Sequence, residues 1–155
     1  MATKITVKVE GLRQLGEAMR LLSKEISTKI ARSATGSAAS LIRKRARALA
    51  PVADEDYEVD GVKVPRGNIR DNIVAKRVSK GRTTLTSEHL VVVRGKAKHG
   101  YASRIGSMHE YGTVKMSAHP FMRPAFDQQK TVAIRKIKDR IAAGIAKAAS
   151  KVPKR

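Results

Sequence analysis

The chain has 155 residues, contains no cysteine, and carries 33 basic against 13 acidic side chains, a formal net charge of +20. This length suits one domain with its own core, and the absence of cysteine excludes disulfides and thiolate metal sites. No long apolar segment follows Met1 or occurs elsewhere, so we expect no ordinary secretory signal, no membrane partner and a protein made and used in soluble form. The charge favours nucleic acid, anionic surfaces or acidic protein partners, and composition does not choose among them.

One acidic segment interrupts the basic chain. Residues 1–50 carry 11 basic and 3 acidic side chains, residues 68–155 carry 20 and 5, and residues 51–67 carry 2 and 5. Prolines lie at or near both ends of the acidic segment, so we interpret it as an exposed loop insertion. The alternative is an acidic patch that docks on a basic neighbour of the same kind.

The first half of the chain predicts one strand and one long helix. Apolar and polar residues alternate over 4–10, which is typical of a half-buried strand. From Leu12 to Ala50 apolar residues recur every three or four positions, as on one face of a helix. Small residues fill positions 33–40 and include Gly36. We expect this run either to bend the helix or, as the favoured interpretation, to let another helix approach closely.

The second half predicts a hairpin, a short helix and a terminal helix. Asn68 is expected to cap a short turn. Residues 73–78 and 90–93 are rich in β-branched side chains and predict an antiparallel hairpin. A short amphipathic segment then ends at Gly112-Thr113, and a helix with a stripe of isoleucines runs from about residue 120 to residue 152.

These elements predict an α+β fold in a single domain over residues 1–152. A small antiparallel sheet of three or four strands would pack against a long helix in the N-terminal half and a long C-terminal helix, which buries both apolar stripes. The acidic segment at 51–67 would be a loop insertion in this domain. Residues 153–155 would form a frayed basic tail.

Aromatic side chains are concentrated in residues 101–126. The segment holds both phenylalanines and two of the three tyrosines of a chain that has no tryptophan. We expect Phe121 and Phe126 to be buried near one another where the last helix begins. We also expect Glu110 to be a surface or interface carboxylate and His119 to hold the entrance to that helix.

No set of residues in the sequence supports catalysis. The four histidines are ten residues apart, which is neither a helical nor a strand spacing: His89, His99, His109 and His119. His109 and Glu110 are neighbours and point different ways from a helix, whereas zinc needs three or four converging ligands. Nucleophile-elbow and phosphate-loop motifs are absent. We therefore predict no catalytic residue, no metal, no cofactor and no enzymatic activity.

Basic clusters leave nucleic-acid binding open. The candidate contacts to DNA or to acidic partners are Arg43, Lys44, Arg45, Arg47, Lys136, Lys138 and Arg140. These side chains can neutralise phosphates, or they can form a solvated helix face. The sequence has no helix-turn-helix pattern, zinc finger or aromatic platform, so any such binding would be independent of base sequence.

Six short motifs follow one another along nearly the whole chain. They are Gly11-Leu12 with the leucine-spaced helix that follows it, Ala50-Pro51-Val52, Gly67-Asn68-Ile69-Arg70-Asp71-Asn72-Ile73, Tyr101-Ala102, Glu110-Tyr111-Gly112-Thr113 and His119-Pro120-Phe121-Met122-Arg123-Pro124-Ala125. In this order they resemble the head-to-tail joining, or tail-completion, neck proteins of tailed bacteriophages, related to minor tail protein Z. The last two motifs are the more specific ones. The acidic segment and residues 104–107 lengthen the spacing that is usual in that family.

The resemblance implies structural roles for the motif residues. These are Pro51, Gly67, Arg70, Tyr101, Glu110, Tyr111, Gly112, Thr113, His119, Pro120, Phe121, Arg123 and Pro124. It also implies a structural virion protein of a siphophage that forms a homo-oligomeric ring, expected to be a hexamer, around the DNA path at the head-tail junction. Its implied partners are connector or head-completion proteins, tail-tube or tail-terminator proteins, and double-stranded DNA that passes the lumen without specific recognition.

The same resemblance implies a location in the virion neck or tail, with assembly in the host bacterial cytoplasm. The alternative function, which the charge alone supports, is a basic protein that binds nucleic acid independently of sequence. A lumen that bound DNA tightly would impede its exit. We therefore favour docking on acidic proteins for most of the positive charge.

Overall fold

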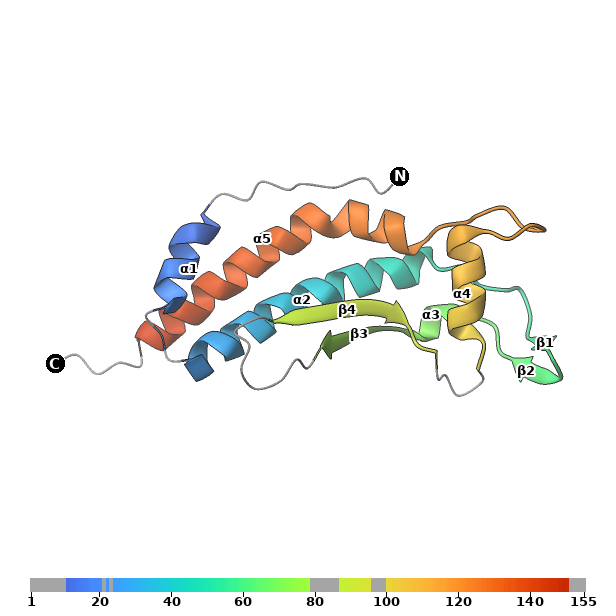
Figure 1. Ribbon diagram of the computed structural model, residues 1–155, viewed down its shortest axis with the longest axis horizontal. Helices are drawn as coiled ribbons and strands as arrows, with labels where there is room; N and C mark the ends of the chain where they lie inside the picture. The colour runs from blue at the N-terminus through green and yellow to red at the C-terminus, as the bar shows by residue number, and fades with distance from the viewer. Residues whose placement is uncertain (1–10, 21, 23, 79–86, 96–99, 151–155) are drawn as a thin grey trace.

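The computed structural model describes residues 11–20, 22, 24–78, 87–95 and 100–150. In chain order the elements are α1 (Leu12–Arg20), α2 (Lys24–Leu49), β1 (Tyr57–Val59), β2 (Val62–Val64), α3 (Asn68–Asp71), β3 (Ile73–Val78), β4 (Glu88–Val93), α4 (Ala102–Tyr111) and α5 (Met122–Ala149). Figure 1 shows an elongated molecule in which α2 and α5 lie side by side, α1 lies against α5, and β3 and β4 lie on the other side of α2.

The predicted α+β class and both long helices are confirmed. The sheet differs from the prediction, because the described residues form two separate two-stranded antiparallel sheets, β1–β2 and β3–β4. In the predicted hairpin, Ile73 pairs with Val93 and Val78 with Glu88. The predicted strand at 4–10 and the predicted tail at 153–155 lie outside the described residues.

The acidic segment contains a hairpin where we predicted a loop. Tyr57 pairs with Val64 and Val59 with Val62. The two turn residues, Asp60 and Gly61, have φ values of 50° and 75°, as a type I′ turn requires and as Asp-Gly sequences favour. Val64 is fully buried and fixes the hairpin to the rest of the molecule. An Asp-Gly pair between two valine-containing runs was therefore the informative signal, and the acidic composition obscured it.

The predicted long helix is divided into two helices. α1 ends at Arg20 and α2 begins at Lys24, so the interruption lies before the run of small residues and not within it. Within that run Ala34, Ala38 and Ala39 are buried, and α2 makes its most extensive contact with α5. These contacts agree with the favoured interpretation, in which the small residues let another helix approach closely, and α2 continues through Gly36 without interruption.

The main hydrophobic core lies where α2, α3, β3 and the start of α5 meet. Its buried members are Ala46, Ala50, Ile69, Ile73, Phe121 and Ala125. Phe121 is only 1% exposed, whereas Phe126 is 46% exposed. The prediction that both rings are buried near one another is wrong, because five residues in a helix separate two side chains by about 140° around its axis.

Among the described residues, no helix is both long enough and apolar enough to cross a membrane.

We predict that Phe121→Ala lowers the free energy of unfolding by about 3–5 kcal/mol, the usual range for emptying a buried phenylalanine site. Phe126→Ala is the matched control, and its half-exposed ring should make the loss much smaller. Urea denaturation followed by circular dichroism measures both. Equal losses in the two variants would contradict the core described above.

Candidate functional site

A buried carboxylate joins α4 to α5. Glu110 lies in the last turn of α4 and is 7% exposed. The backbone N–H groups of Phe121 and Met122 donate to its Oε2 at 2.8 and 2.9 Å, and that of Arg123 donates to Oε1 at 3.1 Å. The first N–H groups of a helix have no partner within the helix, and a negative charge is favoured there. Glu110 is therefore an internal anchor, and the expectation of a surface or interface carboxylate is wrong.

Arg123 adds a second connection between the same two helices. Its Nε lies 3.6 Å from Glu110 Oε1, and its guanidinium carbon lies 4.9 Å from the centre of the Tyr111 ring. Cations stack favourably on aromatic faces at such distances. Tyr111 nevertheless remains 70% exposed, so most of its ring is available to a partner.

The loop between α4 and α5 is closed by backbone contacts. Gly112 has φ 74° and ψ 178°, a region that essentially only glycine adopts. A Cβ at this position would lie 3.0 Å from Met116 O and from Ala118 N. At the other end of the loop, the backbone N–H of His119 donates to His109 O at 2.7 Å. His119 therefore fixes the approach to α5 through its backbone, while its ring is exposed.

The tip of this loop exposes apolar surface. Val114 is fully exposed, and Lys115 beside it is also exposed. Thr113 and Met116 bridge across the tip, which holds these side chains outward. Figure 1 shows the loop extending beyond α4, toward the end of the molecule that carries β1 and β2. We define residues 111–120 as the α4–α5 loop and consider it the candidate partner-binding site.

The Gly67 to Ile73 motif forms α3 and its flanks. The N-cap is Gly67, with φ 76°, and not Asn68 as predicted. Asn68 is buried, and its side-chain amide donates to Gly100 O at 3.1 Å and accepts from Asn72 at 2.9 Å. A Cβ on Gly67 would lie 2.9 Å from the guanidinium of Arg70. This motif thus fixes how the chain runs from the hairpin of β1 and β2 into β3.

The structure brings together only part of the family motif. Glu110, Tyr111, Gly112, Thr113, His119, Phe121 and Arg123 meet at the α4–α5 junction, with Pro120 just before α5 and Pro124 in its first turn. Pro51 lies two residues after the end of α2, and Tyr101 is the N-cap of α4, with a positive φ of 55°. Gly67 is the N-cap of α3, and Arg70 lies within that helix.

Two arginines of the predicted basic cluster on α2 form hydrogen bonds with other parts of the same chain. Arg47 donates to Arg70 O at 2.9 Å and to Asp71 O at 2.7 Å, where it satisfies carbonyls at the end of α3. Arg45 donates to the side chain of Gln128 at 2.6 Å. Arg43 has a buried Nε without a partner among the described residues, and Lys44 is exposed. The four side chains do not form one continuous cationic surface.

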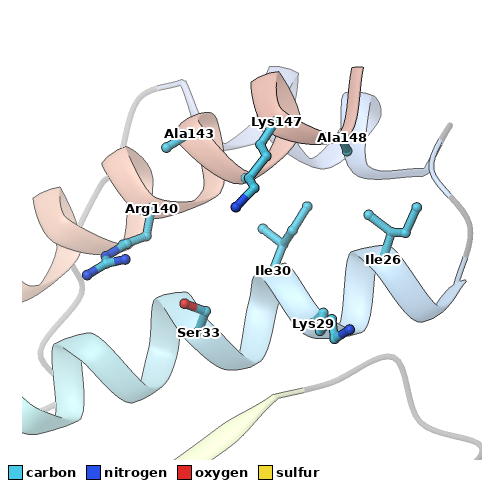
Figure 2. Close-up of a pocket in the computed structure, with 9 residues that line it drawn as sticks. Ile26, Lys29, Ile30, Ser33, Arg140, Ala143, Lys147 and Ala148 are labelled. Atoms are coloured by element: carbon cyan, nitrogen blue, oxygen red, sulfur yellow. The ribbon is translucent and has the colours of Figure 1, made fainter. Parts of the chain in front are cut away.

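The basic residues predicted on α5 have different surroundings. Lys136 and Lys138 are half-buried, and Arg140 is exposed. Arg140 also borders a groove of about 560 Å³ between the start of α2 and the end of α5 (Figure 2). We call this groove the cationic groove, and it is lined by Ile26, Lys29, Ile30, Ser33, Arg140, Ala143, Gly144, Lys147 and Ala148.

The cationic groove was not predicted from the sequence. Three of its lining side chains are cations, Lys29, Arg140 and Lys147, and none is acidic. They come from helices at opposite ends of the chain, which converge only because α2 and α5 pack antiparallel. The only sign of the groove in the sequence is a lysine or arginine near small or apolar residues on each helix. Because this pattern is common on solvated helix faces, it does not by itself predict a groove.

The described residues contain no group of three or more His, Asp or Glu side chains that could hold a metal ion.

His109 has a buried ring nitrogen, Nδ1, without a hydrogen-bond partner among the described residues. Burial, and secondarily the nearby charge of His119, lowers the pKa of His109 below its usual value.

Comparison with protein families identifies the chain. The family model described as "Bacteriophage HK97-gp10, putative tail-component" matches residues 13–112, which is more than half of the sequence. The chain belongs to this family. Searches of curated proteins and of solved structures gave no significant match. The resemblance to phage tail proteins is thus confirmed for a tail component, and the match spans α1 to α4 and ends at Gly112.

We predict that Glu110→Ala destabilises this tail component by about 1.5–3 kcal/mol, the range for hydrogen bonds to a charged group. Amide hydrogen exchange at Phe121, Met122 and Arg123 should accelerate, because their N–H groups lose their acceptor. Glu55→Ala, at an exposed site, is the matched control and should change stability by less than about 0.5 kcal/mol. Unchanged exchange at the three amides would refute the anchor.

We also predict a loss of stability on acidification. Since the pKa of His109 is lowered in the folded state, the unfolded chain binds the proton more readily. Stability is unaffected by this group well above pH 6.5 and falls as the pH decreases through and below that value. His109→Gln should reduce the difference in unfolding free energy between pH 7.5 and pH 5.5. An identical difference in both proteins, measured by urea denaturation, would show that His109 plays no part.

Proposed function

We propose that this tail component acts at the phage head-tail junction, where it completes the tail as a homo-oligomeric ring around the DNA path. The observation that carries the proposal is the α4–α5 loop. The loop exposes Val114 fully at its tip and Tyr111 by 70% where it leaves α4, yet its backbone is held at Gly112 and His119. Exposed apolar side chains on a fixed backbone are typical of surfaces that bind another protein.

The proposed role is structural. Joining two preassembled particles requires complementary surfaces and no bond-breaking chemistry, so we assign no catalytic residue, metal or cofactor. The partners would be connector or head-completion proteins on one side and tail-tube or tail-terminator proteins on the other. Assembly would take place in the host bacterial cytoplasm, and the assembled protein would remain in the virion neck.

The apolar stripe of α5 supports the ring. Ile134, Ile137, Ile141 and Ile145 recur along one helix at three-to-four spacing and are all half-buried in the single chain. Neighbouring copies can cover what remains exposed. A contact between different faces of identical copies gives a ring when the rotation from one copy to the next closes on itself, and a hexamer is the expected size.

Most of the positive charge would meet acidic protein partners. DNA must move through the lumen, and counterion release makes binding to many cationic side chains tight at low salt. The competing function, a free protein that coats nucleic acid, predicts DNA binding with a steep salt dependence and no binding to tails. A filter-binding assay at several salt concentrations separates the two.

We predict that Val114→Asp reduces the joining of purified heads and tails at least tenfold without changing the melting temperature. A buried charge at an apolar contact is costly, while the exposed tip contributes little to the fold. Val114→Ile keeps the apolar character and should retain joining. Normal joining by Val114→Asp would remove the loop from the binding site, and failure of the unaltered protein to bind purified tails would refute the proposed function.

A further inference from the structure

Two chemically opposite surfaces lie at opposite ends of the molecule. The acidic hairpin, residues 51–67, lies at the end that carries α4, and the cationic groove lies at the end that carries α1 (Figure 1). The helix α5 lies along most of the distance between them, and its 28 residues span about 42 Å at 1.5 Å per residue. The hairpin of one chain therefore does not reach the groove of the same chain.

The acidic hairpin presents unpaired carboxylates beside apolar side chains. Asp54, Glu55 and Glu58 are exposed and form no ion pair with any described residue. Val52 and Val62 are each 39% exposed. The type I′ turn and the buried Val64 fix the backbone that carries Glu58 and Val62, and the backbone N–H of Arg66 donates to the side chain of Asp56, next to Glu55, at 2.9 Å.

The cationic groove has the complementary arrangement. Lys29, Arg140 and Lys147 likewise form no ion pair within the described residues. Figure 2 shows Ile26 and Ile30 pointing from α2 toward α5, and Lys147 extending from α5 into the space between the helices. The groove thus offers apolar walls and cationic rims to an occupant that carries carboxylates next to small apolar side chains.

A glycine keeps the helices close at the base of the groove. A Cβ on Gly144 would lie 2.8 Å from two side-chain carbons of Ile30. This contact leaves Ile30 only 8% exposed and sets the depth of the groove. The shape therefore follows from the packing of α2 on α5 and does not depend on a ligand.

We propose that the cationic groove is the docking site for the acidic hairpin of a second copy of this chain. The inference rests on the proposed ring and names the contact that closes it. Two copies with a net charge of +20 each repel one another, so their association needs local complementarity. Residues 51–67 are the acidic part of the sequence, and joining them to the groove of the next copy uses different surfaces on identical chains, as a closed ring requires.

The absence of cysteine from the sequence permits a distance test by disulfide formation. We would introduce Val62→Cys in the hairpin and Ser33→Cys in the groove, and oxidise the purified protein with diamide, both free and bound to purified tails. A disulfide requires Cα atoms within about 7 Å. The expected result is a ladder of covalent oligomers on a denaturing gel. Val62→Cys with Lys76→Cys, on the exposed part of β3, is the matched control and should remain monomeric.

Exchange of charges between the two surfaces is the second test of the docking site. One variant carries Asp54→Lys, Glu55→Lys and Glu58→Lys, and the other carries Lys29→Glu, Arg140→Glu and Lys147→Glu. Each alone should lose ring assembly by at least tenfold, measured by light scattering and by imaging on tail ends. An equimolar mixture should recover it, since each contact is again between opposite charges. Reversal of the exposed Lys76, Arg77 and Arg94 should leave assembly unchanged.

The outcomes separate this inference from the proposed function. Rings or tail binding without the Val62–Ser33 disulfide, or without recovery in the mixture, would overturn the docking site and leave the head-tail role standing. Absence of rings and of tail binding in the unaltered protein would overturn both. A disulfide ladder together with recovery in the mixture would establish the contact.

Discussion

One buried carboxylate determines how the two halves of the molecule are joined. Glu110 lies in the last turn of α4 and accepts hydrogen bonds from three consecutive N–H groups at the start of α5, so it fixes both the position and the rotation of the longest helix. Everything that α5 presents depends on this contact, from the buried Phe121 at its start to Gly144 near its end. A carboxylate near the C-terminus of its own helix is unfavourable, and the amides of the next helix offset that cost.

Small side chains are the second constraint. Ala34, Ala38 and Ala39 on α2 are buried where α5 lies close, and Gly144 performs the same role on α5. Close packing of two long helices gives a rod-like shape with distinct ends. Such a shape separates the acidic hairpin from the cationic groove, which allows a single sequence to carry two complementary surfaces without neutralising either.

The sequence predicts the local elements well and their tertiary contacts poorly. β-branched runs, helical periodicity and the Gly112 and Pro120 signals placed β3, β4, α4 and α5 close to their observed limits. The partner of Glu110 could not be predicted, because it consists of backbone amides 11, 12 and 13 residues away and leaves no pattern of side chains. The cationic groove likewise depends on which faces of two distant helices meet. The acidic hairpin was predictable from Asp60-Gly61, and a prediction based on charge alone missed it.

The contact between Glu110 and α5 also limits which changes of chain length the protein tolerates. An extra residue in the loop before residue 120 can be accommodated by a wider loop, because the helix beyond remains held by the same three amides. An extra residue inside α5 advances all later side chains by 1.5 Å and rotates them by about 100°. The positions of the four isoleucines would then be taken by Ala133, Lys136, Arg140 and Gly144. Insertions should therefore be tolerated on one side of this anchor and excluded on the other.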